Sequence, residues 1–412
     1  MRISVPVGRK ASGFHLTGGH RPASIERDAR LRGVDRELLR GGVGLVFTVV
    51  QELGSVGQAE LGQAAFRRFI KTLDPRHSVQ YWGWPAALIR AVTAAYAETE
   101  HFEPGKVAVT GASKNGASPS VALLHDKRMT ALHSSVAPIW DSPLRLCDRT
   151  AWKNLRAENQ RYVRGLQAAN RRVNSRRLLN HRFLGGTFGP VYNSQALAAG
   201  HNWDDLRRLA HRMKDHVFVA RHLKTLASRN VDLCFHPGTH DFVAFDMAWG
   251  GQHHPGVPIY LRVNSGHGKS RRHPNAETDE QNKPAFLLRH FFKGVAAPLT
   301  PPSVTTRVDG QRLLVTVTFE PGSVSESGRI WWMFDRGPDG SAAYINELFP
   351  SDQWKDMTGD SKTNSWSTAI PIETGASHID FFSNHRKTVT YRSVNYSSYR
   401  SSPYTRVWLG RN

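Results

Sequence analysis

Ser113, Asp241 and His267 have the side-chain types that nucleophilic catalysis by a hydroxyl group requires. A histidine can accept the proton of a serine hydroxyl, and a carboxylate can hold the imidazole in the tautomer that accepts it. Each of the three residues follows a run that favours a β-strand, and each stands in a loop. We therefore predict that they form a catalytic triad.

Ser113 stands between a predicted strand and a predicted helix. The run Val107–Thr110 is β-prone, residues 111–113 interrupt it, and helix-forming residues follow. This pattern is typical of a nucleophile elbow, in which small neighbours allow a strained turn that exposes the serine above a sheet. The usual glycine two residues after the serine is replaced by Asn115, with Gly116 next. From this segment alone, an ordinary strand-to-helix turn remains an alternative.

Asp241 and His267 follow two later strand-like runs. Asp241 lies in the loop PGTHDF after Val231–His236, and His267 lies in the loop NSGHG after Pro258–Val263. The carboxyl ends of parallel strands share one edge of a sheet, where ligands bind. Asp141, at the end of another apolar run, is an alternative source of the carboxylate. The simpler interpretation, a turn-capping aspartate and an ordinary loop histidine, also remains open.

Strand and helix patterns alternate through residues 1–298, which predicts an α/β domain with a mostly parallel sheet. Since Ser113, Asp241 and His267 follow one another in the chain order of α/β-hydrolases, we expect this domain to be α/β-hydrolase-like. We expect a short strand at 14–20, buried strands at 44–50 and 130–140, and helices at 61–73, 85–99 and 285–292. Residues 141–229 are predicted to form a helical, arginine-rich cap insertion. Few residues precede Phe14, so we expect either a shortened sheet or a chain whose first strands are missing.

The composition changes after the proline-rich segment 298–302. Short alternating runs separated by Gly, Asp, Ser and Asn predict an antiparallel β-sandwich over residues 303–412. This region holds several tryptophans, which we expect mainly in the core, with a glycan-binding face as the alternative: Trp331, Trp332, Trp354, Trp366 and Trp408.

The chain is strongly basic, with 55 Lys and Arg against 34 Asp and Glu, a net charge of +21. The segment Arg161–Arg182 alone carries seven arginines and no acid. Such a field favours acidic partners, so we predict anionic substrates, although a solvated helical face would have the same composition. Nucleic acid is not expected, because no binding motif accompanies the charge. We assign substrate-binding roles to four residues: Trp84, Trp140, Arg171 and Arg172.

Membrane spans, cofactors and metal ions are not predicted. No apolar run approaches the roughly 18 residues needed to cross a bilayer, and the first residues, MRISVPVGRK, lack the apolar core of a signal peptide. The default expectation is a cytoplasmic protein, or a secreted or periplasmic one if the start is truncated. His236 and His240 are four residues apart, but they flank a Pro-Gly turn and would not share a helical face as zinc ligands do. Two cysteines, Cys147 and Cys234, cannot build a disulfide framework.

Several stretches resemble the PhoPQ-activated pathogenicity-related proteins, a branch of the α/β-hydrolases. The similar stretches span most of the chain and read FIKTLDPRH, VTGASKNG, HDKRMTALHSSVAPIWD, HPGTHDF and YLRVNSGHG. That family carries arginine, glycine and tryptophan after the Ser-Lys pair, whereas this chain has Asn115, Gly116 and Ala117. The Ser-x-Asn-Gly turn is also similar to that of glucuronoyl esterases.

The resemblance implies a serine hydrolase with Ser113 as nucleophile, Asp241 as acid and His267 as base. It also implies an oxyanion hole formed by the amide of Lys114 and the loop that contains Gly18 and Gly19. We expect a small-molecule or glycan ester as substrate, including anionic or carbohydrate-linked esters, and favour ester over amide bonds. The alternatives are a peptidase and a binding protein that keeps the fold without catalysis.

Overall fold

The computed structural model describes residues 1–19, 31, 33–50, 60–135, 137–171, 193–267 and 273–410. The chain divides into two compact units, each made of three segments. The first unit contains Met1–Pro138, Phe188–Cys234 and Lys283–Ala296, and the second contains Ile139–Thr187, Phe235–Asn282 and Ala297–Asn412. The boundaries predicted from the sequence, 1–298 and 303–412, divide the chain differently, because two internal segments group with the C-terminal strands.

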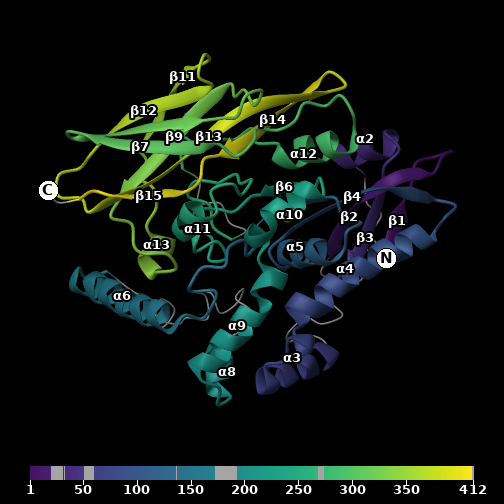
Figure 1. Ribbon diagram of the computed structural model, residues 1–412, viewed down its shortest axis with the longest axis horizontal. Coiled ribbons are helices and arrows are strands. Elements are labelled where there is room, and N and C mark those ends of the chain that lie inside the picture. The colour runs from purple at the N-terminus through teal and green to yellow at the C-terminus, as the bar shows by residue number, and fades with distance from the viewer. Residues whose placement is uncertain are drawn as a thin grey trace. The chain divides into compact units, whose positions relative to one another are not determined.

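A six-stranded sheet in the order β1-β3-β2-β4-β5-β6 forms the centre of the first unit (Figure 1). Strand β2 pairs in parallel with both β3 and β4, β4 pairs in parallel with β5, and β1 is antiparallel to β3. The chain leaves β2 for β3 on one side and returns to β4 on the other, so the strand order reverses between β2 and β4. Ligands bind at the carboxyl edge of such a reversal. The strands are β1 (Arg2–Ser4), β2 (Ala11–Gly19), β3 (Gly44–Val49), β4 (Phe102–Ala112), β5 (Ala131–Ser135) and β6 (Asp232–Phe235).

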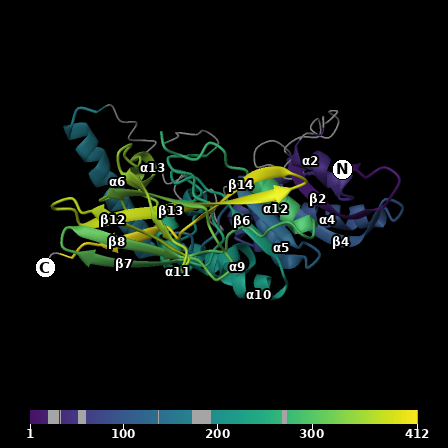
Figure 2. The ribbon, with the colours of Figure 1, turned by 90° about the horizontal axis from the view of Figure 1, so that it is seen from above.

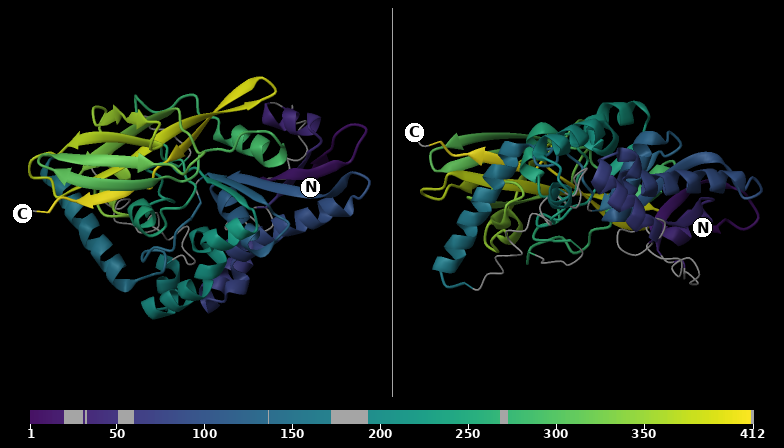
Figure 3. Two further views of the ribbon diagram at one scale, coloured as in Figure 1. Left: turned by 45° about the horizontal axis from the view of Figure 1, so that its top comes forward. Right: turned by 90° about the horizontal axis from the view of Figure 1, so that it is seen from below.

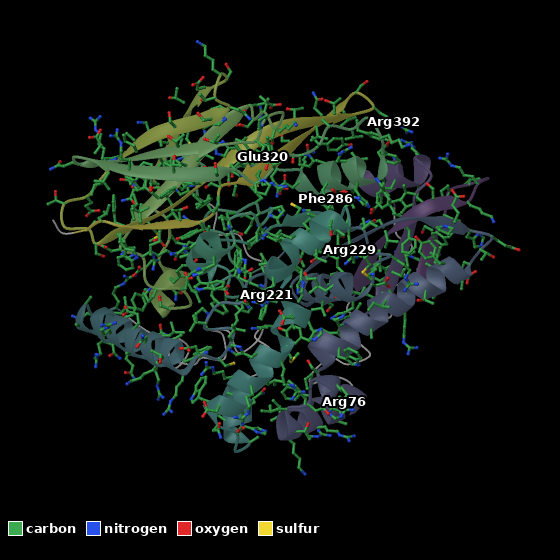
Figure 4. The ribbon with its side chains drawn as sticks, in the orientation of Figure 1. Arg76, Arg221, Arg229, Phe286, Glu320 and Arg392 are labelled. Atoms are coloured by element: carbon green, nitrogen blue, oxygen red, sulfur yellow. The ribbon has the colours of Figure 1, made fainter. Side chains whose placement is uncertain are left out.

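Helices pack on this sheet through buried apolar side chains. Leu38 of α2 and Phe286 and Leu287 of α12 join Ala108 and Ala131 of the sheet in one core cluster. Arg229, after α10, donates a hydrogen bond of 3.1 Å to the carbonyl oxygen of Leu123 in α5 (Figure 4). The α-helices of this unit are α2 (Val34–Arg40), α3 (Glu60–Thr72), α4 (Trp84–Ala97), α5 (Lys114–His125), α8 (Asn193–Ala198), α9 (Trp203–Val217), α10 (Leu223–Ser228) and α12 (Asn282–Phe291).

The second unit contains two antiparallel sheets (Figure 2). One sheet has the order β10-β9-β13-β14 with β15 paired to β13, and the other has the order β11-β12-β8-β7. Apolar side chains from both sheets share one core cluster, which confirms the predicted β-sandwich. The strands are β7 (Ser303–Asp309), β8 (Arg312–Thr318), β9 (Ser327–Phe334), β10 (Trp354–Asp356), β11 (Thr358–Asp360), β12 (Ser365–Pro371), β13 (His378–Tyr391), β14 (Val394–Ser401) and β15 (Thr405–Trp408).

Strands β13 and β14 form a long hairpin, drawn in yellow-green to yellow in Figure 3, which pairs Asn384–Tyr391 with Val394–Ser401. Three helices also belong to this unit: α6 (Arg149–Ala168), α11 (Met247–His253) and α13 (Ala342–Asn346). Trp331 and Trp332 are buried as expected for core residues, whereas Trp408 is 68% exposed.

Two predicted strands differ from those observed. The run at 130–140 forms a strand only to Ser135, and Pro138, which has no amide proton, follows soon after. The run Pro258–Val263 makes only isolated parallel bridges, one of them between Ile259 and Phe235. The other bridge joins Arg262 to Gly238, and the Ser401 amide donates to the carbonyl oxygen of Ile259 at 2.9 Å.

The α/β class, the mostly parallel sheet and the antiparallel sandwich are as predicted. The described parts of 141–229 are mainly helical, as expected of the insertion. Its role as a cap over an active site stays a prediction.

Candidate active site

Ser113 has the backbone of a strained elbow between β4 and α5. Its φ of 58° and ψ of −126° lie in a region that residues with a side chain rarely adopt. The Ser113 amide donates to the carbonyl oxygen of Ser135 at 2.9 Å, and the Ser113 carbonyl oxygen accepts from the amides of Gly116 and Ala117 at 2.8 Å. The end of β5 and the first turn of α5 therefore hold the strained residue from both sides.

Two glycines allow α5 to approach the sheet at this elbow. A Cβ atom on Gly111 would lie 1.7 Å from the carbonyl oxygen of Asn115, and one on Gly116 would lie 2.7 Å from the carbonyl oxygen of Ser135. Gly116, the third residue after the serine, is therefore the glycine that lies close to β5. Asn115, at the usual glycine position, is accommodated and only 6% exposed.

A cavity of about 520 Å³ lies at the carboxyl edge of the first unit's sheet, beside the elbow. It is lined by Gly18 and Gly19 from the end of β2 and by Gly111 and Ala112 from the end of β4. A Cβ atom on Gly19 would lie 2.3 Å from the Phe47 ring, so a side chain there would require this ring to move. The structure thus brings the predicted oxyanion loop and the elbow to one cavity, at the strand reversal between β2 and β4. Oxyanion binding by Gly18, Gly19 and Lys114, the first residue of α5, stays a prediction.

Asp241 and His267 form a hydrogen-bonded pair in the second unit. Nδ1 of His267 lies 3.1 Å from Oδ1 and 3.3 Å from Oδ2 of Asp241. The Asp241 side chain is fully buried, whereas 26% of the His267 side chain is exposed. The Phe242 ring packs on the imidazole, with 4.5 Å between ring centroids. A buried carboxylate therefore orients an imidazole that solvent can reach, which is the relation of acid to base in a triad.

Backbone contacts brace the loops that carry this pair. The His240 amide donates to the carbonyl oxygen of Ser265 at 2.9 Å, and the Asn264 amide donates to Oγ1 of Thr239 at 2.9 Å. A Cβ atom on Gly238 would lie 2.2 Å from that same Ser265 oxygen. The glycine of the PGTHDF loop is thus needed for the two loops to touch.

A buried arginine supports the same loop, and sequence reasoning missed it. Arg336 is fully buried, and its Nη2 donates to the carbonyl oxygen of Thr239 at 2.6 Å. Its Nη1 donates to the hydroxyl of Tyr404 at 2.5 Å. Arg336 stands in the loop after β9, nearly a hundred residues along the chain, so no local pattern signals the contact.

The proposed substrate-binding residues lie in different environments. Trp84 is 1% exposed and Trp140 is 3% exposed, and the Trp140 ring packs against Gly250. This burial favours packing roles. Arg171 is exposed, whereas Arg172 and the rest of the second half of the arginine-rich segment lie outside the described residues. Substrate binding by these residues stays a prediction.

The described ranges of the chain contain no group of three or more His, Cys, Asp or Glu side chains that could hold a metal ion. Within the same ranges, no helix is long and apolar enough to cross a membrane. Cys147 and Cys234 are buried and are not joined in a disulfide.

A mostly parallel sheet with a serine on a strained strand-to-helix turn at its carboxyl edge is the arrangement that characterises an α/β-hydrolase-like fold. No protein-family model matches the chain, and no curated protein sequence is similar to it.

Solved structures with some likeness include hydrolases. An AbyA5 structure is 14% identical with a TM-score of 0.32, over 64% of this chain and 56% of that chain. An acylaminoacyl peptidase of Pyrococcus horikoshii is 12% identical with a TM-score of 0.36, over 65% of this chain and 35% of that chain. A puromycin-hydrolyzing peptidase of Mycobacterium tuberculosis is 15% identical with a TM-score of 0.31, over 69% of this chain and 33% of that chain. The matched region therefore spans between a third and just over half of these proteins, and at such TM-scores the likeness alone establishes neither fold nor activity.

Proposed function

We propose that the protein is a serine hydrolase that cleaves carboxylic esters through an acyl-enzyme. The observation that carries the proposal is the backbone of Ser113, whose φ of 58° is positive for a residue with a side chain. Such strain persists only where the surrounding structure enforces it, and it clusters at functional sites. The hydrogen-bonded pair of Asp241 and His267 supports the same assignment.

In the proposed reaction, Oγ of Ser113 attacks the carbonyl carbon of the ester while His267 accepts the hydroxyl proton. Asp241 holds the imidazole through Nδ1 and stabilises the imidazolium that forms. Backbone amides of Lys114 and of the loop with Gly18 and Gly19 bind the oxyanion. His267 then returns the proton to the leaving alcohol, which departs and leaves Ser113 acylated. A water molecule, deprotonated by His267, attacks the acyl-enzyme, and His267 returns this proton to Oγ of Ser113 as the carboxylic acid leaves.

A fluorophosphonate probe tests this proposal directly, because it labels only an activated serine. We expect labelling of the intact protein, loss of labelling in Ser113→Ala, and retention in Ser12→Ala, where an exposed serine of β2 is changed. Labelling that survives Ser113→Ala would rule out the assignment. A protein that never reacts, although folded, would instead be the binding protein that keeps this fold without catalysis.

Ester preference is the finer part of the proposal. The test compares an aryl ester with an anilide. Both carry the same acyl group and the same aromatic ring, which is bonded through oxygen in the ester and through nitrogen in the amide. We expect the ester to have the higher kcat/KM by more than the difference in intrinsic reactivity between the two bonds. A smaller difference would favour a peptidase.

We also propose membership of the PhoPQ-activated pathogenicity-related proteins, on the five similar stretches, and a preference for anionic esters. Arg171 and Arg172 would raise the local concentration of such substrates. Steering by exposed charges weakens as the Debye length falls from about 10 Å at 0.1 M salt to about 3 Å at 1 M. Equal kcat/KM for neutral and anionic esters at low salt would contradict the preference.

A further inference from the structure

The cavity beside the elbow contains a single cationic side chain. Among the described residues that line it, Lys283 is the only lysine or arginine, and none is an aspartate or glutamate. The remaining lining groups are backbone and the side chains of Thr17, Phe47, Thr110, Ala112, Asn115, His133 and Ser135. A positive charge therefore borders the cavity that Gly111, Ala112 and Asn115 line beside the elbow, and the relation holds within the first unit alone.

The side-chain ammonium of Lys283 makes no hydrogen bond and no ion pair within 4 Å among the residues that the structure describes. Lys106, by comparison, donates to the carbonyl oxygen of His290. Lys283 is exposed, yet partial loss of solvent lowers the pKa of its ammonium group, and Asp35 opposes this by attraction. The ammonium is therefore available to a ligand.

A neighbouring cavity of about 250 Å³ contains a carboxylate that attracts Lys283. Lys283, Thr17 and Phe47 line both cavities, and the smaller one also contains Asp35 and His15. The Asp35 carboxylate is itself engaged by His15, with 3.7 Å between Oδ1 and Nδ1. Asp35 thus attracts Lys283, which also lines the larger cavity.

Helix electrostatics do not account for a lysine here. Lys283 is the second residue of α12, and the positive end of the helix dipole disfavours a cation in the first turn. The same dipole favours an anion close by. The helix end therefore adds to the positive charge of Lys283 and does not offset it.

We propose that this cavity holds a carboxylate of the substrate, with the Lys283 ammonium as its counter-ion. The inference rests on the proposed esterase function and names its substrate class, an ester that carries a second, ionised carboxyl group. The carboxylate would accept charge-assisted hydrogen bonds from Lys283, while the ester carbonyl lies at the elbow in the same cavity. Neutral esters would lack this contact.

Two substrate pairs test the inference. One pair is the para-nitrophenyl monoester of succinate and its methyl ester, which differ in charge on the acyl side. The other is the acetyl ester of para-hydroxybenzoate and its methyl ester, which differ in charge on the leaving group. The measurement is kcat/KM of the intact protein, Lys283→Gln, Lys283→Arg and the control Lys293→Gln, an exposed lysine just after the same helix.

We expect the intact protein to prefer the anionic member of at least one pair. Lys283→Gln should lower kcat/KM for that ester about tenfold more than for its neutral partner, as loss of one hydrogen bond to a charged group predicts. Lys283→Arg should keep most of the preference, and Lys293→Gln should not alter it. Absence of a preference in both pairs, or a preference that survives Lys283→Gln, overturns the inference.

A binding measurement separates this inference from the proposed reaction. Titration of the succinate monoester into Ser113→Ala by calorimetry needs no turnover. Binding that is about tenfold weaker after Lys283→Gln is added supports the carboxylate site even if the protein proves not to be an esterase. Equal binding to both variants contradicts it, while loss of neutral-ester hydrolysis in Ser113→Ala still supports the reaction.

Discussion

Asp141 and His254 form a hydrogen bond, with 3.0 Å between Oδ1 of the aspartate and Nε2 of the histidine. Asp141 is the alternative source of the triad carboxylate, and it is 6% exposed. Its carboxylate is therefore engaged by a histidine other than His267, whereas Asp241 bonds to His267 itself.

We predict that Asp241→Asn lowers kcat by about four orders of magnitude, the loss expected when the imidazole is held in the wrong tautomer. Asp141→Asn should lower kcat less than about tenfold, because it changes only the partner of His254. Steady-state hydrolysis of one neutral ester by both variants is the measurement. The opposite order of losses would place the triad acid at Asp141.

The strained backbone at Ser113 predicts a difference in stability between two inactive variants. At a φ of 58°, glycine is favoured over alanine, so Ser113→Gly should have a free energy of unfolding about 1 to 2 kcal/mol higher than Ser113→Ala. Both variants should be inactive. Urea denaturation provides the comparison, with Ser12 of β2 as control, where glycine should be the less stable choice. Equal stability of the two Ser113 variants would mean that the turn is not strained.

Gly111 and Gly165 predict opposite effects of the same substitution. Gly111→Ala forces a Cβ atom to 1.7 Å from a backbone oxygen of α5 and should destabilise the protein by about 3 kcal/mol or more. Gly165 lies inside α6 with nothing within 4 Å of its Cβ position, so Gly165→Ala should stabilise it by up to about 1 kcal/mol. Thermal unfolding measures both. A harmless Gly111→Ala would show that α5 does not approach β4 as closely as described.

Burial lowers the pKa of His385 in β13 to about 3. The unfolded chain has the ordinary value of about 6.5, so between these two values the unfolded state binds a proton that the folded state does not. The free energy of unfolding should therefore fall as pH falls through this window, by up to about 1.4 kcal/mol per pH unit. His385→Gln should reduce this slope, and His253→Gln, at an exposed site, should not. Urea denaturation across the window provides the measurement, and an unchanged slope in His385→Gln would contradict the prediction.

The elbow was predictable because its signals are local. A β-prone run, two glycines and a helix-forming segment lie within about a dozen residues, and the observed strand, turn and helix follow that order. The pairing of Asp241 with His267 could also be predicted from the sequence, because both loops follow strand-like runs. By contrast, Arg336 contacts the loop of Asp241, and Ser401 contacts the run that precedes the loop of His267, both from the C-terminal part of the chain. Such partners depend on tertiary packing, so neither periodicity nor turn chemistry could indicate them.

The position of Gly116 indicates that a strand-to-helix turn of this kind can form with a spacing between serine and glycine that differs from the usual one. The space beside β5 must stay empty of a side chain, but in this protein the residue that faces it comes one position later than the usual spacing allows. A search that demands glycine two residues after serine would pass over chains built in this way. A search for Gly-x-Ser-x-Asn-Gly between a β-prone run and a helix would find them, and it would test whether asparagine and a shifted glycine recur together as a second solution to the same steric problem.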